Sequence, residues 1–203
     1  MAQDSTRKPT QLVLLDRDGV INLDSPNYIK SVEEWQPVAG SLAAIAQLND
    51  AGIDTALCTN QSGISRGKLG ARDLAAIHYR FSRELAKAGG RIRLWRFCPH
   101  LPEHRCSCRK PKTAMVDDCL TELGVESSAT AFIGDSLKDM QVAISANCLP
   151  ILVHPSNGRE DAPATELANK ASAIGVREIV MDLAAAAERI LQLNRKWHKR
   201  AAL

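Results

Sequence analysis

The stretch that most constrains this chain is residues 12–22, where a short apolar run leads directly into two acidic residues. Residues 12–15 read Leu-Val-Leu-Leu, which is typical of a strand buried in a parallel sheet. Asp16 and Asp18 follow, and Gly19 permits a sharp turn. Carboxylates there lose hydration at a cost in free energy, and open α/β sheets bind ligands at this end of their strands. The pattern predicts either a ligand site or a strand that ends in a solvated acidic loop.

Length and composition favour one globular domain without a nucleic-acid or membrane partner. The chain has 203 residues and a formal net charge of +3, which is too mild to indicate nucleic acid or a membrane surface. We see no apolar run near the ~20 residues of a membrane span, and the polar N-terminus lacks the features of a secretory signal. We therefore expect a cytoplasmic protein. Nothing indicates an obligate dimer, so we expect a monomer.

Strand-like and helix-like patterns alternate along the chain. After residues 12–15, strands are expected at 53–58, 92–97, 130–133 and 149–153, and helices at 41–50, 71–88, 113–123 and 179–193. This alternation predicts an α/β fold with a Rossmann-like, doubly wound parallel sheet covered on both faces. Residues 23–37 read as a loop or flap. We expect a disordered lead-in at 1–10, one domain at 11–195 and a basic tail at 196–203.

Polar residues gather where four of these strands end. The four clusters are Asp16 and Asp18, Thr59 and Asn60, Arg109 and Lys110, and Asp135 and Asp139. Carboxylates suit Mg²⁺, which prefers oxygen ligands, while a lysine and a threonine hydroxyl suit a phosphoryl group. A carboxylate can also attack phosphorus and form an aspartyl-phosphate. The set therefore indicates phosphoryl-transfer chemistry.

With these residues in view, the chain resembles the haloacid dehalogenase (HAD) superfamily of phosphatases. The matching motifs are Leu-Leu-Asp-Arg-Asp-Gly, Thr-Asn-Gln-Ser-Gly, Arg-Lys-Pro and Ile-Gly-Asp-Ser-Leu-Lys-Asp. The resemblance implies a HAD-like fold, with Asp16 as nucleophile and Mg²⁺ ligand. It implies that Asp18 is the general acid and base and binds Mg²⁺ through its backbone carbonyl. Asp135 would be the third Mg²⁺ ligand. Asp139 would not bind the ion itself but would orient the residues that do.

The same resemblance implies how the substrate is held. Thr59 and Lys110 would hold the transferring phosphoryl group, with Asn60 and Gln61 of the same motif in the binding site. Roughly 40 residues separate the first two clusters and about 49 separate the second from Lys110. Neither interval has room for a separate cap domain, so we expect an open active site bounded by short loops.

A cysteine-rich loop at residues 98–108 predicts a second metal site. Cys98, His100, Cys106 and Cys108 supply three thiolates and one imidazole, which matches a closed structural Zn²⁺ site. The alternatives are a loop of free thiols, or His104 as the fourth ligand instead of His100. The three remaining cysteines read as small buried apolar residues; they are Cys58, Cys119 and Cys148.

This loop, followed directly by Arg-Lys-Pro, narrows the resemblance to two related groups of enzymes. They are the D-glycero-D-manno-heptose 1,7-bisphosphate 7-phosphatases, which serve lipopolysaccharide core synthesis, and the histidinol-phosphate phosphatases. We favour the first group because a second domain has no room here. The resemblance then implies that Arg109 recognises the substrate and that Asp24 and Asn27 contact sugar hydroxyls. It leaves open whether Arg66 reaches the substrate. A zinc-containing module that binds nucleic acid through the basic tail is a third reading, and it leaves the aspartates unexplained.

Overall fold

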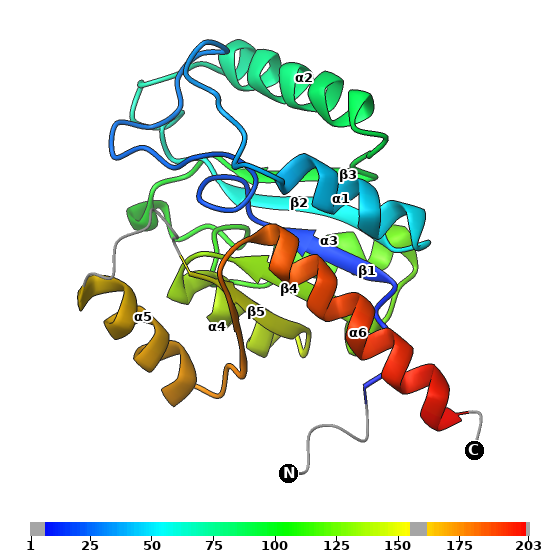
Figure 1. The fold of residues 1–203 in the computed structure, drawn as a ribbon. Coiled ribbons are helices and arrows are strands. Elements are labelled where there is room, and N and C mark those ends of the chain that lie inside the picture. The colour runs from blue at the N-terminus through cyan, green and yellow to red at the C-terminus, as the bar shows by residue number, and fades with distance from the viewer. Residues whose placement is uncertain (1–6, 155–161, 202–203) are drawn as a thin grey trace.

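A six-stranded parallel sheet forms the centre of the structure, a computed structural model that describes residues 7–154 and 162–201 (Figure 1). The strands across the sheet follow the order β3-β2-β1-β4-β5-β6, and each adjacent pair is parallel. Their bounds are β1 (Leu12–Leu15), β2 (Asp54–Asn60), β3 (Leu94–Cys98), β4 (Thr130–Gly134), β5 (Leu149–Val153) and β6 (Glu178–Val180). The doubly wound parallel sheet predicted from the sequence is confirmed.

Helices cover both faces of this sheet, as Figure 1 shows. Helices α1, α2 and α6 pack on one face, and α3, α4 and α5 on the other. Their bounds are α1 (Ser41–Asp50), α2 (Ala71–Lys87), α3 (Ala114–Leu123), α4 (Leu137–Ser145), α5 (Ala162–Ala173) and α6 (Leu183–Ala201), with short 3-10 helices η1 (Pro102–His104) and η2 (Ser127–Ala129). In the described residues the intervals between strands contain these helices and loops, and no separate cap domain.

The central strand β1 shows why its sequence is an unbroken apolar run. Leu12 and Leu14 pack with residues of α3 and α4, whereas Val13 and Leu15 pack with residues of α1, α2 and α6. All four side chains are fully buried, because successive side chains of a strand point to opposite faces and both faces are covered here. Burial of this strand on both sides fixes the position of the polar residues that follow it.

The C-terminal third differs from the sequence-based expectation. The helix expected at 179–193 begins at Leu183 and continues to Ala201, while Glu178–Val180 forms the edge strand β6. Helix α5 was not predicted. The edge strand has three half-buried residues, too few to show an alternating pattern. Residues 196–201, expected as a tail, continue helix α6.

The beginning of the chain also differs from the expected disordered lead-in. Residues 1–6 of that expectation lie outside the described residues. The backbone of Lys8 donates a hydrogen bond to Ser128 O. Thr10 exchanges two hydrogen bonds with the Asn194 side chain, 2.8 and 2.9 Å long. Residues 7–10 are therefore tied to η2 and α6.

The ends of the elements agree with several capping signals in the sequence. Ser136 caps α4 by accepting a hydrogen bond from the Asp139 amide, as expected for a serine at this position. Gly124, just after α3, has a φ of +65°, which glycine adopts without a steric penalty. None of the helices in residues 7–154 and 162–201 has the length and apolar character needed to cross a membrane.

Candidate active site

The candidate site lies where the carboxyl ends of β1 and β4 meet. The strand order reverses beside β1, with β2 on one flank and β4 on the other, and ligands of such sheets bind at this reversal. Leu15 is paired with Ile133, so the residues that follow these two strands emerge side by side. Asp16, Asp135 and Asp139 each place one carboxylate oxygen within a group whose atoms lie within 4.8 Å of one another. We call these three residues, together with Lys110, the acidic centre.

Two glycines make this close approach possible. Gly19 has a φ of +77°, and a Cβ atom at its position would lie 1.9 Å from Asp135 Oδ2. A Cβ atom at Gly134 would lie 2.2 Å from the Cβ of Asp139. Any side chain at either position would therefore displace a carboxylate of the acidic centre.

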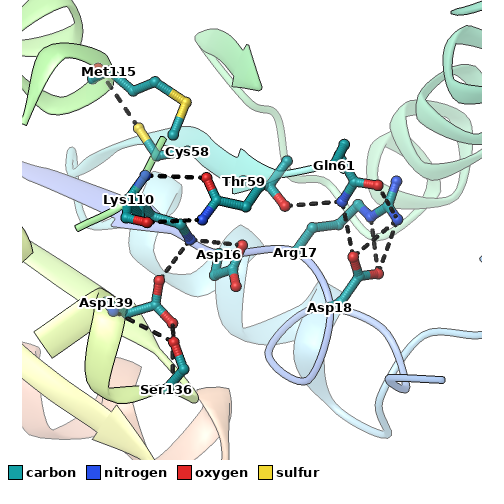
Figure 2. Close-up of polar contacts among 11 residues, drawn as sticks. Asp16, Arg17, Asp18, Cys58, Thr59, Gln61, Lys110, Met115, Ser136 and Asp139 are labelled. Atoms are coloured by element: carbon teal, nitrogen blue, oxygen red, sulfur yellow. Dashed lines mark hydrogen bonds and ion pairs between the residues drawn. The ribbon is translucent and has the colours of Figure 1, made fainter. Parts of the chain in front are cut away.

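Lys110 joins two of the carboxylates, as Figure 2 shows. Its ammonium Nζ lies 2.9 Å from Asp16 Oδ1 and 2.6 Å from Asp139 Oδ1, and its side chain is 2% exposed. The other Asp139 oxygen accepts hydrogen bonds from the Ser136 amide and hydroxyl. Asn60 fixes the Lys110 backbone, because its amide group donates to Lys110 O and accepts from Lys110 N.

The charges of the acidic centre depend strongly on one another. Burial, partly offset by Lys110 and reinforced by Asp139 and Asp18, raises the pKa of Asp16 to about 6. Burial and the neighbouring Asp16 and Asp139 raise the pKa of Asp135 well above its ordinary value. Although burial acts against it, the charges of Asp139 and Asp16 raise the pKa of Lys110. Three carboxylates beside one ammonium leave an excess of negative charge, and a divalent cation would relieve it.

A pocket of about 400 Å³ opens over the acidic centre. Its lining includes Asp16, Asn60, Arg109, Lys110, Asp135 and Lys138. Arg109, Lys110 and Lys138 could bind the anionic atoms of a ligand, and the carboxylate oxygens of Asp16 and Asp135 could bind a cation. The pocket thus offers both kinds of partner that a phosphate ester with a bound Mg²⁺ requires.

Two predicted binding residues are buried beside the pocket. Thr59 is 1% and Gln61 4% exposed, and the Gln61 amide nitrogen donates a 3.0 Å hydrogen bond to Thr59 Oγ1. The same nitrogen donates to Asp18 Oδ2 at 2.8 Å. Gln61 therefore bonds to protein side chains, and its expected contact with the substrate stays a prediction.

Asp18 lies on the far side of Asp16 from the Lys110–Asp139 pair in Figure 2. Its carboxylate accepts hydrogen bonds from the side chains of Arg17, Asn22 and Gln61. No role was predicted for Arg17 or Asn22 from the sequence. Strand alternation gave no signal for Arg17, because this residue lies after the end of β1 at Leu15.

The predicted sugar contacts lie on the loop at residues 23–37. Asp24 and Asn27 are exposed. Asp24 Oδ1 accepts a hydrogen bond from the Ser25 amide, and its charge adds to the raised pKa of Asp135, so this loop lies near the acidic centre. The Asn27 backbone N–H donates to the Ser25 hydroxyl. Arg66 is also exposed, in the loop after β2, and it does not belong to the lining of the pocket.

A second group of candidate ligands lies at the end of β3 and in the loop that follows it. The ligand atoms of Cys98, His100, Cys106 and Cys108 lie within 4.8 Å of one another. We call these four residues the thiol cluster. The Cys98–Cys106 and Cys106–Cys108 sulfur distances are 3.6 and 3.5 Å, and His100 Nδ1 lies 3.3 Å from Cys108 Sγ. A tetrahedral ion with Zn–S bonds of about 2.3 Å would separate two sulfurs by about 3.8 Å. The cluster therefore fits a tetrahedral metal ion.

His104 and the three remaining cysteines do not belong to the thiol cluster. His104 Nδ1 accepts a hydrogen bond from the Leu101 amide, and His104 does not belong to the four-residue group. Cys58, Cys119 and Cys148 are buried as predicted. The Arg109 guanidinium donates a 3.0 Å hydrogen bond to His100 O, which connects the thiol cluster to the pocket lining.

Comparisons with known proteins agree with this geometry. A sequence model of the haloacid dehalogenase-like hydrolases matches residues 9–147. The chain is 46% identical over 147 residues to D-glycero-beta-D-manno-heptose-1,7-bisphosphate 7-phosphatase of Pseudomonas aeruginosa, covering 72% of this chain and 83% of that protein. It is 43% identical over 182 residues to the enzyme of that name from Bordetella bronchiseptica, covering 90% and 98%.

Two solved structures share the fold. The crystal structure of D,D-heptose 1,7-bisphosphate phosphatase from B. bronchiseptica, complexed with magnesium and phosphate, has a TM-score of 0.79 and 41% identity, covering 90% of this chain and 99% of that one. The structure of D,D-heptose 1,7-bisphosphate phosphatase from Burkholderia thailandensis has a TM-score of 0.64 and 32% identity, with the same coverage. Sequence motifs, fold and relatives agree, and this chain belongs to the haloacid dehalogenase-like hydrolases.

Proposed function

We propose that this protein is a Mg²⁺-dependent phosphatase that removes the 7-phosphate of D-glycero-β-D-manno-heptose 1,7-bisphosphate through an aspartyl-phosphate on Asp16. The observation that carries the proposal is the contact of Asp16 with Lys110 in a pocket that Asp135 also lines. The relatives named for this reaction support the substrate and the β-anomer. The sequence left that anomer open.

The chain's own residues account for both halves of the reaction. A carboxylate oxygen of Asp16 attacks phosphorus, and the bond from phosphorus to the sugar oxygen breaks with its electron pair on that oxygen. Asp18 gives this oxygen a proton, and heptose 1-phosphate leaves. Asp18 then takes a proton from water, whose oxygen attacks the aspartyl-phosphate and releases phosphate. Lys110 balances the negative charge at the reacting phosphoryl group.

The acidic centre fits Mg²⁺ by its donor atoms and its excess negative charge. Asp16, Asp135 and the Asp18 backbone carbonyl would hold the ion. Bound there, Mg²⁺ would neutralise phosphoryl oxygens and lower the repulsion between phosphate and carboxylates. Asp139 would act from behind the ligands, because Lys110 and Ser136 already occupy its two oxygens.

The remaining predicted contacts divide between the substrate and its surroundings. Arg109, which lines the pocket, would bind the second phosphate, since a guanidinium matches phosphate geometry. Asp24 and Asn27 would contact sugar hydroxyls from their loop. Thr59 would hold the phosphoryl group, and Asn60 would hold Lys110 in place.

We propose that the thiol cluster holds one structural Zn²⁺. Three sulfurs and one ring nitrogen form a closed set of four ligands, and such sets hold zinc without an open position for chemistry. The Arg109 contact to His100 O would then make the ion part of the support for phosphate recognition. Monomeric state, cytoplasmic location and lack of a nucleic-acid partner stay predictions.

Phosphate release by the purified protein, with and without Mg²⁺, tests the proposal. The substrates are the β- and α-anomers of the heptose bisphosphate and histidinol phosphate. We expect the highest kcat/KM for the β-anomer, and a higher value for histidinol phosphate would overturn the substrate assignment. Asp16→Asn should abolish turnover, while the control Asp54→Asn, at the opposite end of the sheet beside Arg93, should retain it. Substantial turnover by Asp16→Asn would refute the aspartyl-phosphate mechanism.

A further inference from the structure

Arg17 is a fully buried arginine in the middle of the first motif. It stands between Asp16 and Asp18 in the sequence, and it is 0% exposed. A guanidinium cannot lose its charge in a protein, so its burial requires partners that compensate for lost hydration. Those partners lie on one side of the acidic centre, as Figure 2 shows.

The Arg17 guanidinium binds the Asp18 carboxylate through two parallel hydrogen bonds. Arg17 Nε donates to Asp18 Oδ1 at 3.0 Å, and Arg17 Nη2 donates to Asp18 Oδ2 at 3.0 Å. Nη2 also donates to Gln61 Oε1 at 3.1 Å. A planar guanidinium with two bonds to one carboxylate restricts rotation of that carboxylate. A single ammonium could not impose the same orientation.

Two further donors complete the surroundings of Asp18. The Asn22 side-chain nitrogen donates to Oδ1 at 2.9 Å, and the Gln61 side-chain nitrogen donates to Oδ2 at 2.8 Å. Each carboxylate oxygen therefore accepts two hydrogen bonds. Asn22 in turn accepts a hydrogen bond from the Trp35 indole, and Gln61 donates to Thr59 Oγ1. The orientation of Asp18 is thereby connected to the 23–37 loop and to Thr59.

We propose that Arg17 is a positioning residue, which keeps the Asp18 carboxylate in place while a hydrogen bond from Asn22 or Gln61 gives way to the proton that Asp18 exchanges with the leaving oxygen and with water. The inference rests on the proposed function, in which Asp18 is the general acid and base. Arg17 has no place in the lining of the pocket. It therefore acts through Asp18, and substrate binding should be independent of it.

The leaving group separates this role from a purely structural one. A sugar alkoxide is strongly basic and needs a proton as it departs, whereas p-nitrophenolate is weakly basic and departs without one. A disordered Asp18 should therefore slow the first half-reaction on the sugar phosphate and spare it on p-nitrophenyl phosphate. A loss of packing or stability would affect both substrates alike.

The experiment measures release of heptose 1-phosphate (sugar release) and of p-nitrophenol in the first turnover by rapid quench. In Arg17→Met we expect sugar release to slow by about 100-fold, as misplaced proton-transfer groups typically cause. We expect p-nitrophenol release at nearly the wild-type rate, and an unchanged dissociation constant for both substrates, obtained from the dependence of the first-turnover rate on substrate concentration. Equal slowing on both substrates, or wild-type rates on both, would overturn the role of Arg17.

Two further variants complete the experiment: a conservative change at Arg17 and a control at another arginine. Arg17→Lys keeps the charge but donates from one nitrogen, so sugar release should slow selectively, by a smaller factor than in Arg17→Met. This variant tests the role even if Arg17→Met does not fold. Wild-type rates in Arg17→Lys would overturn the role of the two-point contact. The control Arg189→Met removes another two-point contact, to Glu178 outside the site, and should change neither rate. A wild-type protein that releases no phosphate from either substrate would instead overturn the proposed function, and the inference with it.

Discussion

The acidic centre and the thiol cluster are assembled in opposite ways. The acidic centre draws its residues from the ends of β1 and β4, the start of α4 and the loop before α3. The thiol cluster lies within residues 98–108, at the end of β3 and in the loop that follows it. The first therefore needs several strands of the sheet, whereas the second needs the end of one strand, the loop that follows it and a metal ion. A local spacing pattern in the sequence is therefore enough to reveal the thiol cluster, whereas the acidic centre is revealed by the topology of the strands.

The two groups also differ in how charge is compensated. Lys110 supplies one positive charge inside the acidic centre, so part of that centre is stable in the protein alone. Burial raises the pKa of Cys98 in the thiol cluster to about 12, so a bound cation is needed to hold this sulfur as a thiolate. We therefore expect damage to the acidic centre to affect chemistry most, and damage to the thiol cluster to affect a loop.

The largest effect should come from the cation of the acidic centre. Lys110→Met leaves Asp16 and Asp139 without their ammonium partner. Loss of one charge-stabilising donor typically costs 10²–10³ in rate, and we expect kcat to fall by about 10³. Removal of one partner of a buried ion pair should also lower the free energy of unfolding by about 3–5 kcal/mol.

Steady-state phosphate release and chemical denaturation measure these two losses, and metal analysis should show an unchanged zinc content. Lys87→Met removes an exposed lysine paired with Glu84 and serves as the control. Near-normal kcat in Lys110→Met would contradict the assignment of the acidic centre as the reaction site.

The second-largest fall in activity should come from a side chain that fills the space beside Asp135. Gly19→Ala places a methyl group 1.9 Å from Asp135 Oδ2, so the carboxylate must move. We expect kcat to fall by about 10²-fold, as small displacements of reacting groups do, and the Mg²⁺ concentration for half-maximal activity to rise. Magnesium titrations of activity measure both quantities.

Gly124→Ala is the matched control for this change. Gly124 has a similar φ of +65°, and nothing lies within 4 Å of the position that the alanine methyl group would take. This variant should lose about 1 kcal/mol of stability from backbone strain and keep its activity. Equal activity losses in the two variants would show that strain, and not contact with Asp135, explains the Gly19 effect.

A smaller effect on activity is expected from the thiol cluster. Cys106→Ser should reduce bound zinc from about one equivalent to a small fraction, because one of four ligands is lost. Amide hydrogen exchange should then accelerate in residues 98–108. Because Arg109 is anchored on His100 O, we expect kcat/KM to fall by about tenfold, as loss of supporting contacts often causes.

Metal analysis, hydrogen exchange and steady-state kinetics test this prediction together. Cys148→Ala removes a buried cysteine outside the cluster and should leave zinc content unchanged. Full zinc content in Cys106→Ser would contradict the ligand set. Complete loss of activity with an intact fold would show that the two groups are more tightly connected than their separate construction indicates.

The smallest effect concerns His78, which belongs to neither group. Its ring packs against Trp95, with 4.9 Å between ring centroids. Burial, reinforced by the charge of Arg17, lowers its pKa to about 4. Above pH 6.5 the residue is neutral in both the folded and unfolded protein, so it adds no pH dependence. Between pH 6.5 and 4 the unfolded chain binds the proton more readily, and stability falls as the pH falls.

His78→Leu should remove this component of the pH dependence. It amounts to about 3 kcal/mol at most by the size of the pKa shift. Chemical denaturation at pH 7 and pH 4.5 measures the difference between the wild-type protein and the variant. An identical loss of stability in both proteins would contradict burial of a neutral histidine.

Much of the fold follows from local patterns in the sequence. The run at 12–15 and the helical stripe of α2 predicted their elements correctly, because burial on both faces and an amphipathic stripe leave distinct periods. The short edge strand Glu178–Val180 and helix α5 were missed. Three residues cannot show a period, and their structure depends on pairing with β5.

The sequence predicted which residues gather at the candidate site better than it predicted the hydrogen bonds between them. The sequence indicated that Asp16, Lys110 and Asp135 would meet, because parallel strands end at one edge of the sheet. The sequence did not indicate that the Gln61 amide donates to Asp18 and Thr59, and the expected contact of Gln61 with the substrate stays a prediction. Competition among neighbouring hydrogen-bond partners decides where the amide donates, and spacing along the chain carries no information about it.

The sequence by itself determined which chemical groups stand at the strand ends and which four ligands lie close together along the chain, because strand periodicity and short spacings are local properties. Only the tertiary structure decided that Lys110 lies between Asp16 and Asp139, and that Arg17 turns away from the pocket to hold Asp18. These contacts join side chains whose positions are set by the packing of different strands and loops. Their free energy depends on burial and on competing partners, which exist only once the sheet is closed on both faces.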